Sequence, residues 1–187
     1  MEHSIKVVRH FYNIKSEHFS LEYGDSVKNV KSLENLIYFS NLKSASFNSS
    51  DLNDEGLAFL SNLSQLENLN LQETNISDEG IKNLIKLKNL KYLRLKENAQ
   101  LTDDCVQYLI GIEALEDLQI QGTSITQKGL DQLTVLKNLK NIVLDIWKNN
   151  FTQEALLALS EKMPDCSILA KGKGEFKNGS FEGIWKI

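Results

Sequence analysis

Histidine, cysteine and glycine-rich segments are the parts of this 187-residue chain that could do chemistry. The three histidines, His3, His10 and His18, lie near the start, and their spacing is not the i, i+4 spacing of metal ligands on a helix. Cys105 and Cys166 have no histidine nearby in sequence to activate a thiolate nucleophile. We therefore expect exposed structural histidines, and a buried small residue at Cys105 rather than a reactive thiol.

Two further patterns could bind phosphate or a cation, and neither is complete. The segment Gly172-Lys173-Gly174 lacks the length of a phosphate-binding loop and the Ser or Thr that follows it. The D-x-G steps, such as Asp78-Glu79-Gly80, do not supply the dense alternating oxygens of a calcium loop. The carboxylates recur with the repeat described below, which makes them helix-start and surface residues. The sequence therefore predicts no cofactor, no metal ion and no catalytic residue, and a protein that is not an enzyme.

Composition limits the class of protein and of partner. Hydrophobic residues make up 41% and charged residues 25%, which is typical of a globular protein, and the net charge of -4 argues against nucleic acid. No apolar run approaches the roughly 20 residues that span a bilayer, and the start lacks the pattern of a signal peptide. The two cysteines fall in different repeats, so we expect no disulfide framework, a reducing compartment and a cytoplasmic location. We expect neither nucleic acid nor membrane as a partner, and a monomer as the default.

An internal repeat sets the positions of the side chains in this protein. Segments of the form L-x-x-L-x-L, with some substitutes, begin at residues 42, 66, 90, 115 and 139, at intervals of 24 or 25 residues. Leu66–Leu71 and Leu90–Leu95 match the form fully. A period of 20 to 50 residues is the sequence signature of a repeat architecture.

Each repeat continues in the same way after this segment. An apolar anchor is followed by a residue that can cap a helix, then by acidic residues near the positive helix end and by leucines at helical spacing. Every repeat thus reads as a short strand, a turn and a helix. The anchors are Leu52, Ile76, Leu101, Ile125 and Phe151, and the capping residues are Asn53, Ser77, Thr102, Thr126 and Thr152.

The full pattern, carried best by residues 75–81, resembles the leucine-rich-repeat family over about residues 42–165. The type it is similar to has a helix on the convex side, as in F-box adaptors and many bacterial proteins. Cys105 and Ala155 depart from the pattern by replacing glycine, and Trp147 stands where two other repeats have threonine. The resemblance implies an α/β leucine-rich-repeat solenoid, curved, with a parallel β-sheet on the concave face and helices on the convex face. No F-box-like segment is present, so the ubiquitin-adaptor role is not carried over.

The resemblance also implies a single domain over residues 1–187, with capped ends, because terminal repeats would otherwise expose apolar faces. Residues 1–41 read as an N-terminal cap, with strands over 6–11 and 18–23 and a helix that begins at Asp25 or Ser26 and ends near Ser40. About five repeats fill residues 42–165.

Residues 166–187 are expected to add a C-terminal strand and a β-hairpin cap. Residues 166–169 read as the strand, although their register is ambiguous, and Asn178-Gly179 predicts the hairpin turn. Ile184, Trp185 and Ile187 are apolar enough to cover the open end of the core. The alternative is that this segment is a binding tail.

Alternation along each strand predicts which side chains point away from the core. The leucines point inward and the residues between them outward, with His18, Ser20 and Glu22 extending the same surface through the cap. The outward residues are Ser44, Ser46, Asn48, Asn68, Asn70, Gln72, Tyr92, Arg94, Lys96, Asp117, Gln119, Gln121, Asn141, Val143 and Asp145.

Two parts of this surface are candidates for a protein contact. Tyr92, Arg94 and Lys96 form a basic-aromatic row in its middle, and Tyr and Arg are enriched among interface hot spots. The alternative is an ordinary solvated face on which Arg94 pairs with Asp117. The second candidate is the edge that follows the strands, with Glu73, Glu97, Ile146 and Trp147, where an exposed Trp would be an anchor. The alternative there is that Trp147 folds back over the core.

The sequence therefore favours a non-enzymatic protein-binding module. Its Asn- and Lys-rich, Pro-poor composition suits a bacterial protein, and a stand-alone inhibitor, such as an immunity protein that neutralises a toxin or effector, is the preferred form by analogy. The alternative is an adaptor or scaffold that links two partners through separate surfaces, and an enzyme is a distant third.

Overall fold

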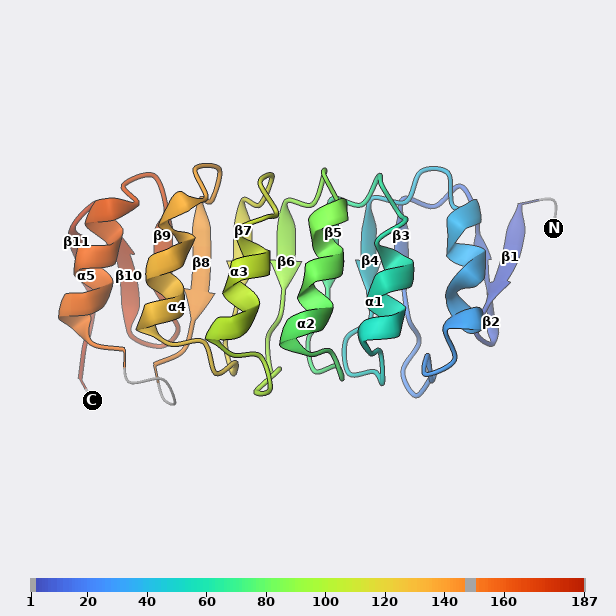
Figure 1. The fold of residues 1–187 in the computed structure, drawn as a ribbon, viewed down its shortest axis with the longest axis horizontal. Coiled ribbons are helices and arrows are strands. Elements are labelled where there is room, and N and C mark those ends of the chain that lie inside the picture. Colours follow the sequence, from blue (N-terminus) through green and yellow to red (C-terminus); the bar gives the residue numbers. More distant parts are fainter. Residues whose placement is uncertain (1–2, 147–150, 187) are drawn as a thin grey trace.

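Short strands alternate with short helices through the middle of the computed structural model, which describes residues 3–146 and 151–186 (Figure 1). The strands are β1 (Ser4–Val7), β2 (His10–Asn13), β3 (His18–Ser20), β4 (Ser44–Ser46), β5 (Asn68–Asn70), β6 (Tyr92–Arg94), β7 (Asp117–Gln119), β8 (Asn141–Leu144), β9 (Ser167–Ala170), β10 (Gly174–Lys177) and β11 (Ser180–Gly183). The α-helices are α1 (Asp54–Leu60), α2 (Asp78–Ile81), α3 (Val106–Leu109), α4 (Gln127–Gln132) and α5 (Gln153–Lys162). The 3-10 helices are η1 (Val30–Tyr38), η2 (Lys82–Lys86), η3 (Asp103–Cys105) and η4 (Leu133–Val135).

A nine-stranded sheet connects the repeats in chain order, from β3 to β11. The strands from β3 to β9 are parallel, and β9, β10 and β11 are antiparallel. Leu69 pairs with Leu93, and Leu93 pairs with Leu118, so equivalent positions of successive repeats lie side by side. The sequence repeat is therefore the structural repeat.

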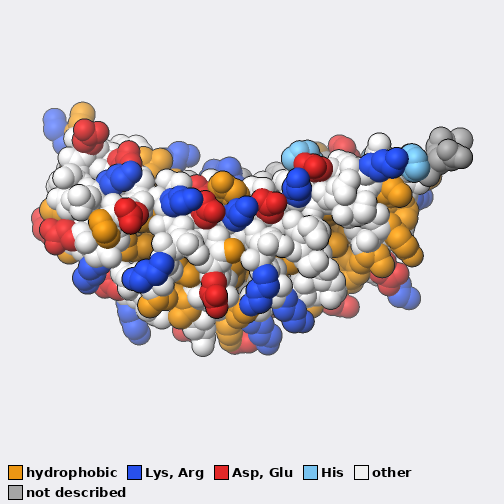
Figure 2. Space-filling view, turned by 90° about the horizontal axis from the view of Figure 1, so that it is seen from above, with side chains coloured by type: hydrophobic (Ala, Val, Ile, Leu, Met, Phe, Trp, Pro, Cys, Tyr) orange, Lys and Arg blue, Asp and Glu red, His pale blue; other side chains and the backbone are white. Residues whose placement is uncertain are grey.

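The core lies between this sheet and the helices, which cover one of its two faces (Figure 1). Leu69, Leu93 and Leu118 are at most 2% exposed, and the apolar anchors Leu52 and Ile76 are fully buried. Seen from above, the side that carries the sheet is hollowed along its middle, and the helical side bulges outward (Figure 2). The unit of strand, turn and helix, stacked in register, gives a leucine-rich-repeat-like fold.

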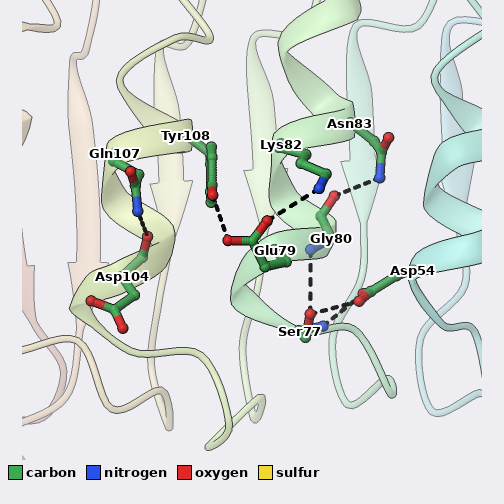
Figure 3. A network of polar contacts seen from close by, with 9 residues as sticks. All are labelled: Asp54, Ser77, Glu79, Gly80, Lys82, Asn83, Asp104, Gln107 and Tyr108. Carbon is green, nitrogen blue, oxygen red and sulfur yellow. Dashed lines mark hydrogen bonds and ion pairs between the residues drawn. The ribbon is translucent and has the colours of Figure 1, made fainter.

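The helix starts are fastened to one another by a row of aspartates. Ser77 donates to the Asp54 carboxylate from its backbone N–H at 2.8 Å and from its Oγ at 2.6 Å (Figure 3). Thr102 makes the same two bonds to Asp78, and Thr126 makes them to Asp103. Each aspartate thus satisfies the capping residue of the next repeat, which joins neighbouring repeats through charge-assisted hydrogen bonds.

This row lies beside the glycine of the D-x-G step. A Cβ at Gly80 would lie 2.0 Å from Asp54 Oδ1, and one at Gly129 would lie 2.4 Å from Asp103 Oδ1. Ala155 replaces the glycine where the preceding repeat has Gln127 in the aspartate's place, so no carboxylate needs the space there. The aspartate therefore occupies the space beside Gly80 and Gly129, although Cys105 stands in the same place beside Asp78 and the structure accommodates its Cβ there.

Paired charges lie immediately before strands β3 to β8. Lys43 pairs with Glu17 at 3.2 Å, Lys91 with Glu67 at 3.0 Å, and Lys140 with Glu116 at 2.6 Å. The residues at these six positions alternate in charge from one strand to the next. If a strand paired with the next strand but one, two like charges would lie side by side. Exposed pairs of this kind each contribute little stability, but they favour the observed register.

The N-terminal segment differs from the prediction at two points. Residues 6–11 do not form one strand, because the chain turns at Val8 (φ 55°) between the antiparallel strands β1 and β2. The helix does not begin at Asp25 or Ser26, because Asn29 caps η1 by accepting from Lys31 N–H. Asp25 is instead buried and accepts from Arg9 Nε at 2.5 Å, a long-range contact that sequence spacing does not reveal.

The hairpin predicted at Asn178-Gly179 is present, with both turn residues at positive φ, as a two-residue type I′ turn requires. Phe176 is fully buried, and its ring lies 4.5 Å from that of Phe181 and 5.5 Å from that of Trp185. Ile184 is 68% exposed, so the expectation that it covers the core is wrong. Ile187 lies outside the described residues.

Candidate functional site

The candidate site is the uncovered face of the sheet, which we call the open face. The strand registers arrange its side chains in rows that cross the strands. The first row is Ser44, Asn68, Tyr92, Asp117 and Asn141, and the second row is Ser46, Asn70, Arg94, Gln119 and Val143.

The structure orients these side chains as the alternation predicts. Leu93 is 1% exposed, whereas its neighbour Tyr92 is 44% exposed and Arg94 is half-buried. A third row, beyond the strand ends, contains Asn48, Gln72, Lys96 and Asp145, none of which is buried. Gln121 is the exception in that row: it is only 7% exposed, so its prediction as a surface residue is wrong.

Hydrogen bonds along the sheet hold the second row in place. Asn70 Nδ2 donates to Ser46 Oγ at 3.2 Å, and Arg94 Nε donates to Gln72 Oε1 at 3.0 Å. Arg94 therefore leans toward the N-terminal repeats, and the expected ion pair between Arg94 and Asp117 is absent from the described residues. Asp117 instead accepts from Gln119 Nε2 at 3.3 Å.

Part of the first row is left without such bonds, although Asp117 accepts one from Gln119. Among residues 3–146 and 151–186, the side chains of Ser44, Asn68 and Tyr92 make no hydrogen bond, and neither do the two Nη atoms of Arg94. Their donors and acceptors are available to a ligand, because the side chains lie on the surface rather than in the core.

A shallow groove of about 400 Å³ crosses the open face over β4 to β7. Short serine and asparagine side chains line part of the groove, and the longer side chains of Tyr92 and Arg94 line it beside them. Its lining includes Ser44, Ser46, Asn68, Asn70, Tyr92, Arg94, Asp117 and Gln119.

The open face continues beyond β8, which the sequence analysis missed. Leu169 lies beside Val143 in the sheet and is 41% exposed, and Glu175 lies on its other side. Ser167 Oγ donates to Glu175 at 2.5 Å. The signal was the alternation of residues 167–170, but it could not be used while the register of this strand was ambiguous.

The second candidate, the edge that follows the strands, is only partly available. Glu73 and Glu97 are exposed and adopt positive φ angles of 54° and 57°. Glu73 accepts from Ser49 Oγ at 2.6 Å, and Glu97 lies 3.7 Å from Lys96 Nζ. Ile146 is 9% exposed and belongs to the core, so it offers no anchor. Trp147 lies outside the described residues.

The two cysteines, which could act as nucleophiles, are buried. Burial and the carboxylates of Asp78 and Asp103 raise the pKa of the Cys105 thiol, and burial raises that of Cys166 to about 12. Both thiols are therefore protonated at neutral pH, the opposite of an activated nucleophile. His10 Nε2 lies 3.4 Å from Asp25 Oδ2, in the N-terminal hairpin region.

Two features are absent from the described ranges, residues 3–146 and 151–186. No group of three or more His, Cys, Asp or Glu side chains that could hold a metal ion occurs in them. None of their helices is both long enough and apolar enough to cross a membrane.

Comparison with known proteins adds a structural likeness. No family model matches the sequence, and no curated protein matches it. Among solved structures, the chain is similar to internalin C2 from Listeria monocytogenes, at 23% identity and a TM-score of 0.48. The match covers 70% of this chain and 62% of the internalin chain, so this chain spans less than two thirds of that protein's length.

Proposed function

We propose that this chain is a non-enzymatic protein-binding module whose contact surface is the open face. The observation that carries the proposal is the contrast between the two central rows. The second row is fixed by hydrogen bonds within the face, whereas the side chains of Ser44, Asn68 and Tyr92 in the first row make none with any residue that the structure describes. A surface whose shape is fixed but whose polar groups are unused loses little conformational entropy when it binds a partner.

The residue types also suit a protein partner. Tyr92 and Arg94 lie together near the middle of the face, where hot-spot residues of an interface cluster. Arg94 and Lys96 are followed by Asp117 and Asp145 toward the C-terminus, so the face offers both signs of charge. We favour a partner that carries both signs as well.

Within this function, we favour an inhibitor that acts by occupying its target, such as a bacterial immunity protein bound to a toxin or effector in the cytoplasm. The support is analogy with repeat scaffolds, together with the mixed charge of the open face. Such an inhibitor forms a stoichiometric complex and abolishes the activity of the bound target.

An adaptor is the second candidate, because exposed aromatic side chains occur in the N-terminal segment. Phe11 is 72% exposed, Tyr23 96% and Tyr38 57%. These residues precede β4, where the groove begins. An adaptor would lose one partner on Phe11→Ser/Tyr38→Ser substitution and a different partner on substitution of the open face.

The test is an affinity capture from cells of the native host, with the partner identified and its stoichiometry measured. The wild-type chain is compared with Tyr92→Ala/Arg94→Glu and with Lys128→Glu, a control on the helical side at an exposed residue of α4. We expect one stoichiometric partner that is lost in the double variant and retained in the control. A partner retained in both variants would move the contact away from Tyr92 and Arg94.

A further inference from the structure

The groove on the open face contains one cation whose outer atoms are unused. Arg94 lines the groove, and within the described part of the chain its Nη1 and Nη2 have no acceptor. We propose that the groove binds an extended segment of the partner through a single carboxylate side chain, from Asp or Glu, received by Arg94. This inference rests on the proposed function and specifies what the open face recognises.

The guanidinium of Arg94 is already oriented for this contact. Its Nε donates to Gln72 Oε1 at 3.0 Å, and the backbone N–H of Gln72 donates to Asn70 Oδ1 at 3.0 Å. These bonds fix one edge of the planar group and leave the two terminal nitrogens for a bidentate carboxylate. The cost of ordering the arginine is therefore met before the partner arrives.

The floor of the groove suits the main chain of an extended segment. Asn68 lies on the strand before Arg94 and presents a carboxamide, which offers the same donor and acceptor groups as a peptide bond. Ser44 lies beside Asn68 on β4, the next strand toward the N-terminus, and adds a hydroxyl. Neighbouring strands are about 4.8 Å apart, so these groups are spaced along a segment that crosses the strands. Tyr92 offers an apolar ring at the groove wall.

The charges around Arg94 limit the segment to one acid at this position. Asp117 lines the same groove, and Glu73 and Glu97 are exposed at the strand ends beside it. A run of acidic residues would bring like charges close to these carboxylates, which is unfavourable. The groove therefore prefers one carboxylate flanked by neutral residues over a polyacidic segment.

The test is selection from a displayed library of random peptides, with the intact chain as bait. Wild type is compared with Arg94→Gln, and with Lys128→Gln as a control that removes a cation at an exposed residue of α4 on the helical side. We expect the wild type and the control to select peptides with one Asp or Glu at a fixed position, and Arg94→Gln to lose this preference. Selected peptides without a fixed acid, or no selected peptide at all, would overturn the proposal.

A selected peptide then allows the contact to be assigned. Replacing its acid by the matching amide is expected to weaken binding to the wild type roughly tenfold, and to change binding to Arg94→Gln little. Equal losses on both proteins would overturn the assignment to Arg94. If the native partner still requires the open face but binds Arg94→Gln as tightly as wild type, the carboxylate proposal fails while the protein-binding function stands.

Discussion

The helix starts and the open face use polar side chains in opposite ways. At the helix starts, the carboxylates of Asp54, Asp78 and Asp103 each accept two hydrogen bonds from the following repeat. On the open face, Asn68 and Tyr92 make no side-chain hydrogen bond within the described residues. The helix starts use their carboxylates to fasten the repeats together, whereas the first row of the open face leaves Asn68 and Tyr92 for a contact from outside.

The interior between these two sides also joins the repeats. Asn98 is fully buried, and its Nδ2 donates to Leu71 O at 2.8 Å and to Leu95 O at 2.9 Å. Its Oδ1 accepts from Thr74 N–H at 2.9 Å. A buried amide that connects two repeats in this way satisfies turn groups that would otherwise be unpaired in the core. The polar groups of the first row are not needed for this purpose.

The largest effect is expected in the core itself. Leu93→Ala should lower the free energy of unfolding by about 2–5 kcal/mol, because Leu93 is 1% exposed and its truncation leaves a cavity between repeats. Denaturant unfolding followed by circular dichroism measures the change. A loss below about 1 kcal/mol would mean that this position is not packed as described.

A smaller loss is expected at the helix starts. Asp78→Ala should cost about 1–3 kcal/mol, because Thr102 loses both of its acceptors. Asp104→Ala is the matched control, since Asp104 lies in the same kind of first helical turn but its carboxylate accepts no hydrogen bond in the described residues. Equal unfolding curves for the two variants would show that the aspartate row does not fasten the repeats.

A still smaller effect on stability, and one that depends on pH, is expected at a contact on the helical side. Tyr108 Oη donates to Glu79 at 2.6 Å and lowers the pKa of that carboxyl below its usual 4.5, with Lys82 adding to the effect (Figure 3). A lowered pKa in the folded state stabilises the protein above pH 4.5, and this stability is lost as the pH falls through the folded pKa. Tyr108→Phe should therefore raise the Glu79 pKa in an NMR titration. The two proteins should differ in stability at pH 7 but converge at low pH; a constant difference would contradict the account.

The smallest effect on folding is expected on the open face. Arg94→Ala should change the free energy of unfolding by less than about 0.5 kcal/mol, because its one hydrogen bond is to the half-buried Gln72 at the surface. Thermal unfolding of the purified variant measures this. A variant that unfolds would mean that the assignment of inner and outer side chains is wrong.

The repeat could be predicted from sequence because the position and the inward face of each strand follow from residues close together in the chain. The leucine register fixes which side chains face the core, and Asn178-Gly179 fixes a hairpin through turn geometry alone. The same logic predicted the open-face residues. It also explains why the resemblance to leucine-rich repeats covers the centre of the chain and not its ends.

The features that the sequence did not predict depend on contacts between residues far apart in the chain. Asp25 was expected to cap a helix and is buried against Arg9, and Gln121 was expected at the surface and is buried. Arg94 has an opposite charge on the neighbouring strand but bonds to the neutral Gln72, a choice of side-chain conformation that spacing cannot decide. Leu169 was missed because the register of β9 depends on its pairing with β8.

The central claim is that the open face binds and the helical side does not. Asn68→Cys on the open face and Lys128→Cys on the helical side can each be labelled with a maleimide that carries a bulky polymer. The native cysteines are at most 1% exposed with raised pKa values, so they should remain unlabelled. Titration calorimetry against the captured partner should show binding abolished by the label at position 68 and unchanged by the label at position 128. Binding that survives the label at position 68 would contradict the account.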